Sequence, residues 1–244
     1  MEQPEGIAGA VAALARELDV DLGTIGVPEK HPATTALVES LVEPREPMRI
    51  DGAPGGPTFV VDGWSRGVRL VGGATTDLGQ IVRAAGAWRH AATLAEITAA
   101  APFLEVDDHA RATELGPAEE VAVQWRHLRR RWAGISDRDP EFRFVVDIID
   151  AAQAQPVLRA LYPYTSLASL CFSFTTGFPF DDTRLPVVDP RVSGGYVVRQ
   201  QRFADDLPPR VYGEADDAAG AVAIVVAHLP EDVGPAVAGT AYDT

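Results

Sequence analysis

A short segment rich in aromatic and hydroxyl side chains is the first candidate for chemistry. It contains Tyr164, Thr165 and Ser166 and leads on to the aromatic segment Phe178–Phe180. Aromatic walls with a few hydroxyl groups suit a concave site for a mostly apolar molecule that is held by a small number of polar contacts. Together with Tyr196, these three residues are candidate substrate-binding groups. The same composition also suits a corner of the core in which tyrosine hydroxyls bond to the backbone.

The serines of this region lack the sequence context of a catalytic nucleophile. No Gly-x-Ser-x-Gly motif surrounds Ser166, Ser169 or Ser173, and the sequence places no histidine and acid beside them. Hydrolase chemistry is therefore disfavoured, and no catalytic residue is assigned.

The second candidate is the segment from Arg126 to Arg131, which contains four arginines and one histidine. Guanidinium groups hold carboxylates and phosphates in two-point geometry, so Arg129 or Arg130 is a candidate substrate-binding group for an acidic moiety. The alternative, which we favour, is a cationic last turn of a helix that complements the helix dipole and pairs with Asp137, Asp139 or the acidic ends of the chain.

Metal and nucleotide signatures do not stand out in the sequence. No two of the five histidines have the three- to five-residue spacing of metal ligands. The triplet Asp107-Asp108-His109 is typical of a solvated turn, and the glycines at 72 and 73 lack the spaced third glycine of a dinucleotide-binding loop. We therefore expect neither a metal ion nor a cofactor.

The composition argues against several classes of function. The chain has 244 residues, with 21 basic and 35 acidic side chains and a net charge of −14, which disfavours nonspecific binding to nucleic acid or to an anionic membrane. The longest apolar stretch, residues 218–227, is roughly half of the ~20 residues that cross a bilayer. The N-terminus lacks the basic region of a secretory signal, and the single Cys171 cannot form an internal disulfide. We expect a cytoplasmic protein.

Apolar periodicity and capping residues predict the helices that position these candidates. The arginine-rich segment ends a helix over residues 117–133, with Pro117 at its first position. Thr93 and Glu96 have the spacing of a capping box. Further helices are expected over residues 6–18, from Thr76 or Asp77 to Trp88, from Asp139 to Ala152, and from Asp216 or Asp217 to about Leu229.

Strands are expected as a hairpin over 58–62 and 67–71 and as separate strands over 170–175, 196–200 and 210–213. Six prolines between Gly23 and Pro57 indicate a connector, with a short helix at Thr35–Leu41. Because helices and strands are segregated, we expect an α+β fold with a small, mainly antiparallel sheet and a buried C-terminal helix. Residues 1–45 are interpreted as an N-terminal helix and proline-rich connector, and residues 46–244 as a single α+β domain.

Three stretches resemble a known family. They are Val71–Phe103, with Trp88 and the Leu94-Ala95-Glu96-Ile97 helix start; Leu161–Pro179, with Leu-Tyr-Pro-Tyr-Thr-Ser and Cys-Phe-Ser-Phe-Thr-Thr-Gly-Phe-Pro; and Ala219–Thr240. The chain resembles an actinobacterial family of unknown function whose members are commonly labelled natural product biosynthesis proteins. It departs from that pattern at Leu167-Ala168, where a polar or imidazole residue is expected. The resemblance implies a cytoplasmic role in specialised metabolism.

Two functional hypotheses follow from the residues and the resemblance. The one that we favour is a cofactor-independent tailoring enzyme, which acts on a small, partly apolar intermediate bound by Tyr164, Thr165, Ser166, Tyr196 and Arg129 or Arg130. The alternative is a noncatalytic binding protein that docks a peptide, a carrier or an acidic partner through the segment from Arg126 to Arg131. The first hypothesis requires the arginine-rich helix end and the tyrosine-rich corner to meet at one hollow.

Overall fold

The computed structural model describes residues 6–53, 56–191, 194–201 and 210–243. The chain divides into two compact units, residues 1–111 and 112–244. This division differs from the boundary near residue 45 that the prolines suggested, because the presumed connector supplies three strands to the sheet of the first unit. Each unit combines helices with an antiparallel sheet, which confirms the α+β fold class.

The sheet of the first unit is an antiparallel meander in which every strand pairs with its neighbour in sequence. Its strands are β1 (Ile25–Gly26), β2 (Thr35–Val38), β3 (Met48–Gly52), β4 (Phe59–Ser65) and β5 (Val68–Thr75). The hairpin of β4 and β5 confirms the strand pair that was expected from the sequence.

The short helix expected at Thr35–Leu41 is wrong, because this segment forms strand β2. Ala36 and Val38 are fully buried and pair with Ile50 and Met48 of β3. Pairing with a neighbouring strand therefore overrides the local preference of four residues that fit either structure.

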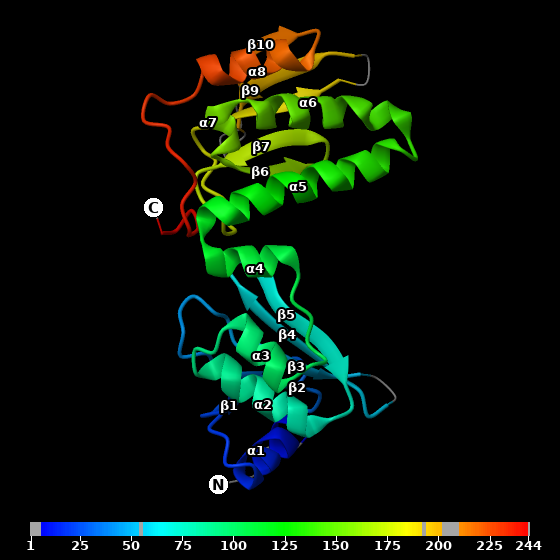
Figure 1. The fold of residues 1–244 in the computed structure, drawn as a ribbon, viewed down its shortest axis with the longest axis vertical. Helices are drawn as coiled ribbons and strands as arrows, with labels where there is room; N and C mark the ends of the chain where they lie inside the picture. Colours follow the sequence, from blue (N-terminus) through cyan, green and yellow to red (C-terminus); the bar gives the residue numbers. More distant parts are fainter. Residues whose placement is uncertain (1–5, 54–55, 192–193, 202–209, 244) are drawn as a thin grey trace. The chain divides into compact units, whose positions relative to one another are not determined.

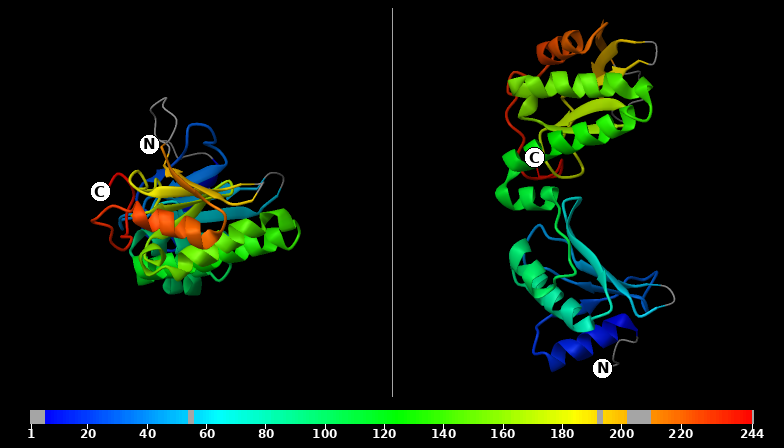
Figure 2. Two further views of the ribbon diagram at one scale, coloured as in Figure 1. Left: turned by 90° about the horizontal axis from the view of Figure 1, so that it is seen from above. Right: turned by 45° about the vertical axis from the view of Figure 1, so that its right-hand side comes forward.

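Helices cover one face of this first sheet, as the right-hand view of Figure 2 shows. They are α1 (Ile7–Glu17), α2 (Leu78–Arg89) and α3 (Leu94–Ala100). Asp77 caps α2 by accepting a hydrogen bond from the Gln80 amide at 3.1 Å, and the capping box of Thr93 and Glu96 at α3 is confirmed. The next helix, α4 (Asp108–Leu115), includes the point at which the two units divide.

The second unit has three long helices that lie side by side over one face of its sheet (Figure 1). They are α5 (Pro117–Ser136), α6 (Arg143–Ala154) and α8 (Ala218–Ala227). A short 3₁₀ turn at Pro140–Phe142 leads into α6, and α7 (Pro156–Arg159) follows it. The helices predicted from Pro117, from Asp139 and near Asp217 are therefore confirmed.

The sheet of the second unit is also a meander of consecutive antiparallel strands. Its strands are β6 (Tyr162–Ser166), β7 (Ser169–Ser173), β8 (Pro186–Pro190), β9 (Tyr196–Gln200) and β10 (Val211–Ala215). The core lies between this sheet and the helices, where the rings of Trp125 and Phe172 are 6.3 Å apart. At the edge strand β6, the Gln124 side chain donates to the carbonyl oxygen of Pro163 at 2.9 Å, so α5 satisfies part of the open edge. In the described part of the chain, no helix has both the length and the apolar character needed to span a membrane.

Candidate functional site

The second sheet separates the residues of the tyrosine-rich corner, because successive residues of a strand point to opposite faces. Thr165 pairs in register with Leu170 on the face that packs against the helices, whereas Tyr164 pairs with Cys171 on the opposite face. The indole nitrogen of Trp132 donates to the Thr165 hydroxyl at 3.3 Å. Thr165 thus lies beneath α5, while Tyr164 faces away from it.

Tyr196 lies in β9, three strands from β6. It is on the helix-facing side, because Leu170 pairs with Val188, Val188 pairs with Val198, and Tyr196 is two residues before Val198. It is 4% exposed, and its hydroxyl donates to the backbone carbonyl of Phe144 in α6 at 2.9 Å. Burial, reinforced by Asp147 and Asp217, raises the pKa of Tyr196 to about 12. The hydroxyl is therefore protonated at neutral pH and joins β9 to the start of α6.

Tyr164 belongs to a small polar network on the opposite face of the sheet. Its hydroxyl donates to the carboxylate of Asp182, and the Gln201 side chain donates to the Tyr164 oxygen at 2.9 Å and to Asp182 Oδ2 at 2.6 Å. Phe180 stacks on the Tyr164 ring with centroids 4.5 Å apart. Burial, followed by the neighbouring Cys171 and Asp182, holds the pKa of Tyr164 far above its usual value. Tyr164 is consequently a hydrogen-bonding group and not a phenolate base.

The two predicted arginines lie on the exposed side of α5. Arg129 forms a two-point ion pair with Asp150 of α6, with contacts of 2.6 and 3.1 Å, and this pairing raises the Arg129 pKa. Arg130 is exposed and has no ion-pair partner among the residues that the structure describes. Ser166 is also exposed, at the turn between β6 and β7. The six predicted substrate-binding residues therefore lie in three places: Arg129 and Arg130 on the helix surface, Thr165 and Tyr196 under the helices, and Tyr164 and Ser166 on the other face of the sheet.

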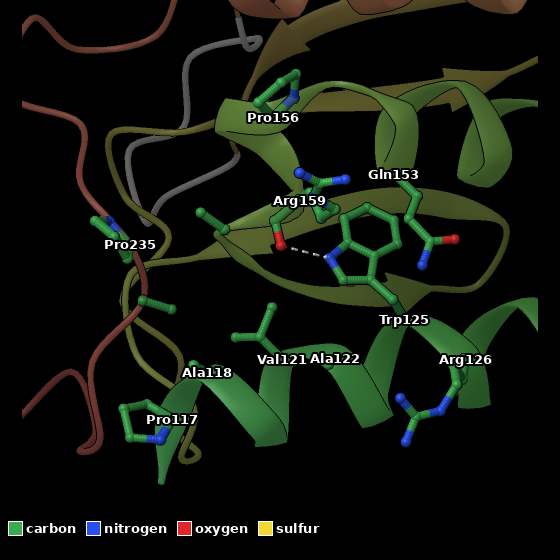
Figure 3. A pocket seen from close by; sticks show the side chains of 12 residues that line it. Pro117, Ala118, Val121, Ala122, Trp125, Arg126, Gln153, Pro156, Arg159 and Pro235 are labelled. Carbon is green, nitrogen blue, oxygen red and sulfur yellow. Dashed lines mark hydrogen bonds between the residues drawn. The ribbon is translucent and has the colours of Figure 1, made fainter.

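A pocket of about 690 Å³ lies elsewhere in the second unit, and we call it the α5–α7 pocket. Figure 3 shows its lining, which comes from the first half of α5, the end of α6, α7 and the segment around residue 235. The lining residues are Pro117, Ala118, Val121, Ala122, Trp125, Arg126, Gln153, Pro156, Arg159, Ala160, Pro235 and Ala236.

Helical spacing and side-chain size explain why a pocket forms here. Ala118, Val121, Ala122 and Trp125 recur at the three- and four-residue intervals that place side chains on one side of α5. The two alanines are small and leave the space that larger residues would fill. The Trp125 indole forms one wall and is itself fully buried. A second wall is fixed by the backbone, since the Ala236 amide donates to the Ala160 carbonyl at 2.8 Å.

The lining is apolar except for three side chains, Arg126, Gln153 and Arg159. None of its residues carries a carboxylate, a thiol, a hydroxyl or an imidazole. Within the described ranges, no group of three or more histidine, cysteine, aspartate or glutamate residues is placed to hold a metal ion. The lining side chains can thus enclose an apolar body and bind polar groups, but they offer neither a nucleophile nor a general base.

Sequence reasoning missed most of this pocket. The arginine-rich segment predicts Arg126 as a cationic residue, but no sequence motif marks Arg159 or the small residues of α5. A detectable signal was the pair Ala118 and Ala122 on the stripe that also carries Val121 and Trp125, because small residues among large ones on one side of a helix leave room for another group.

A family model describes much of this unit. The model of a family of unknown function, DUF6193, matches residues 119–240. The chain belongs to this family. The DUF6193 region includes every residue of the pocket lining except Pro117 and Ala118. It also includes the Leu161–Pro179 and Ala219–Thr240 stretches of the expected resemblance, whereas Val71–Phe103 lies outside it. No curated protein and no solved structure matches the chain.

Proposed function

We propose that the second unit binds a small, largely apolar molecule in the α5–α7 pocket, as a cytoplasmic protein of specialised metabolism. The observation that carries this proposal is the pocket itself. Its volume of about 690 Å³ falls within the ~300–1,000 Å³ of small-molecule sites, and its lining is mostly apolar with a few polar groups. The resemblance to natural product biosynthesis proteins of actinobacteria supplies the metabolic context, so the molecule proposed is a biosynthetic intermediate.

The chemistry of the lining supports binding more than catalysis. General acid–base and covalent catalysis need a side chain that exchanges protons or attacks the substrate, and the pocket contributes none. A role in holding, protecting or delivering the intermediate is therefore the better-supported proposal.

A tailoring enzyme is the second candidate, and Asp182 is the residue that favours it. This carboxyl group is only 8% exposed, yet its hydrogen bonds come from the neutral groups of Tyr164 and Gln201. A carboxyl group that is hydrogen-bonded to a tyrosine hydroxyl is of the kind that general acid–base catalysis uses. Neither Asp182 nor Tyr164 lines the α5–α7 pocket, so this candidate requires a separate reaction site.

A retention experiment tests the binding proposal. The purified full chain is incubated with a small-molecule extract of its source cells, and the compounds that remain bound after gel filtration are identified by mass spectrometry. Ala122→Trp fills the pocket floor, while Ala219→Trp adds the same side chain at an exposed position of α8. Wild type and Ala219→Trp are expected to retain the same compound, and Ala122→Trp to lose it. Equal retention by all three proteins contradicts the proposal.

A second experiment with the retained compound distinguishes a binding protein from an enzyme. The retained compound is incubated with the wild-type protein and with Tyr164→Phe and Asp182→Asn. A binding protein returns the compound with its mass unchanged. A new product that forms with wild type and slows in the Asp182→Asn protein favours the tailoring enzyme instead.

A further inference from the structure

The α5–α7 pocket has positively charged side chains and no acidic ones. Arg126 and Arg159 both belong to its lining, which contains no aspartate or glutamate. The chain as a whole has 35 acidic and 21 basic residues. The charge of the pocket lining, with two arginines and no acid, is therefore opposite in sign to the net charge of the chain. Salt at physiological concentration screens surface charges beyond about 8 Å. The two arginines of the lining therefore affect the binding of a charged molecule more than the distant acidic residues do.

The guanidinium groups of these two arginines make no contact that stabilises the described part of the fold. The acids of α6 are already paired, Asp150 with Arg129 at 2.6 Å and Asp147 with Arg143 at 3.1 Å. Within the described ranges, the guanidinium groups of Arg126 and Arg159 have no hydrogen-bond or ion-pair partner. The contact made by Arg159 at this place uses its backbone carbonyl, which accepts from the Trp125 indole at 3.2 Å.

The placement of the two groups suits a ligand with one apolar and one charged part. In Figure 3 the side chains of Arg126 and Arg159 lie on opposite sides of the Trp125 ring, and the Gln153 side chain lies beside that ring. A flat or aliphatic body can cover the apolar floor, while an acidic group at either end of it meets a guanidinium. Guanidinium forks match the geometry of carboxylate, phosphate and sulfonate oxygens.

We infer that the α5–α7 pocket binds an amphipathic anion, whose apolar body lies against the small apolar residues of the lining and whose acidic group is bound by Arg126 or by Arg159. This inference rests on the proposed function, since it names the class of molecule that the same pocket binds. It assigns specificity to two residues outside the predicted substrate-binding set, and it gives Arg126 a role different from that of its neighbours Arg130 and Arg131.

Two fluorescent probes test the inference because they differ by one acidic group. 8-Anilinonaphthalene-1-sulfonate carries a sulfonate, and N-phenyl-1-naphthylamine has the same aromatic body without it. Dissociation constants of both probes are measured by fluorescence titration for wild type, for the double variant Arg126→Gln/Arg159→Gln and for the matched control Arg130→Gln/Arg131→Gln. The control removes the same number of charges from the same unit, at exposed positions outside the pocket. Ala122→Trp reports whether either probe occupies the pocket.

The expected result is a selective loss of affinity. Arg126→Gln/Arg159→Gln weakens binding of the sulfonate probe about tenfold and changes the neutral probe less than about twofold, whereas Arg130→Gln/Arg131→Gln leaves both within about twofold. Ala122→Trp abolishes binding of both probes.

Two results overturn the inference and are distinct from each other. In the first, Ala122→Trp abolishes binding of both probes, but the two double arginine variants have the same affinities. The pocket then binds apolar molecules without a contribution from the acidic group, and the proposed function stands. If Ala122→Trp leaves both affinities unchanged, the probes bind elsewhere, and the proposed function fails together with the inference.

Discussion

The indole nitrogen of Trp125 donates a hydrogen bond to the backbone carbonyl of Arg159 at 3.2 Å. The next residue, Ala160, accepts a bond from the Ala236 amide at 2.8 Å. These two bonds connect α5, α7 and the C-terminal segment in series around the α5–α7 pocket. Trp125, which forms one wall of the pocket, therefore also fixes the backbone of Arg159, whose guanidinium group is one of the two positive charges of the lining.

Trp125→Phe is expected to lower the free energy of unfolding by about 2 kcal/mol, because the Arg159 carbonyl loses its partner and a smaller ring leaves a void. Urea denaturation followed by circular dichroism measures the change. The matched control is Trp64→Phe, at a position that is 39% exposed, for which a change below about 0.5 kcal/mol is expected. Equal midpoints for Trp125→Phe and wild type would show that the bond contributes nothing to the fold.

Helix starts were the most predictable part of this fold, because capping is a local interaction. The sequence predicts that either Asp216 or Asp217 caps α8. In the structure Asp217 is the N-cap, because its carboxylate accepts from the Gly220 amide at 2.7 Å. Both aspartates are exposed. The two aspartates have the same side chain, but only the backbone position of Asp217 brings its carboxylate within hydrogen-bond distance of an amide in the first turn of α8.

Asp217→Ala is expected to destabilise the chain by about 1 kcal/mol, the usual value of a lost N-cap, and Asp216→Ala by less than about 0.5 kcal/mol. Thermal or urea unfolding of the two single variants provides the comparison. Since both substitutions remove one negative charge, the difference between them isolates the hydrogen bond. A larger loss of stability for Asp216→Ala than for Asp217→Ala would show that Asp216, and not Asp217, caps α8.

The parts that could not be predicted depend on partners distant in sequence. Thr35–Val38 becomes a strand because Met48–Gly52 pairs with it, and no local pattern encodes that pairing. The α5–α7 pocket is assembled from small apolar residues of separate segments, which have no distinctive chemistry of their own. The composition of the tyrosine-rich corner predicts a common hollow for Tyr164 and Thr165, but these two residues are neighbours in strand β6 and therefore point to opposite faces of the sheet.

Cys171 is expected to react slowly with thiol reagents in the folded chain. The side chain is 1% exposed, and burial raises its pKa to about 11. Because the thiolate is the reacting form, a raised pKa leaves little of it at pH 8, and the rate should increase with pH up to that value. Reaction with 5,5′-dithiobis(2-nitrobenzoate) at pH 8 is expected to be roughly two orders of magnitude slower in buffer than in urea. Similar rates in the two conditions would mean that the strand β7 opens readily.

Leu167 occupies the turn between β6 and β7 with a φ of 57° and is 93% exposed. Positive φ brings the Cβ of a leucine too close to the backbone, at a cost of roughly 1–2 kcal/mol that asparagine largely avoids. The exposed side chain gains little packing in return. A polar residue was expected at this place from the family resemblance, and the backbone supplies a physical reason for that expectation.

Leu167→Asn is therefore expected to raise the free energy of unfolding by about 0.5–1 kcal/mol, measured by urea denaturation. Leu115→Asn is the matched control, because that leucine is 73% exposed but lies in the helix α4. Leu115 is the last residue of α4 and is not among the residues with positive φ, so a change of less than about 0.5 kcal/mol is expected for the control. A gain in stability at Leu167 alone would follow from backbone geometry, since both substitutions remove an exposed leucine. Destabilisation by Leu167→Asn would show that this side chain makes a stabilising contact that outweighs the strain of its backbone.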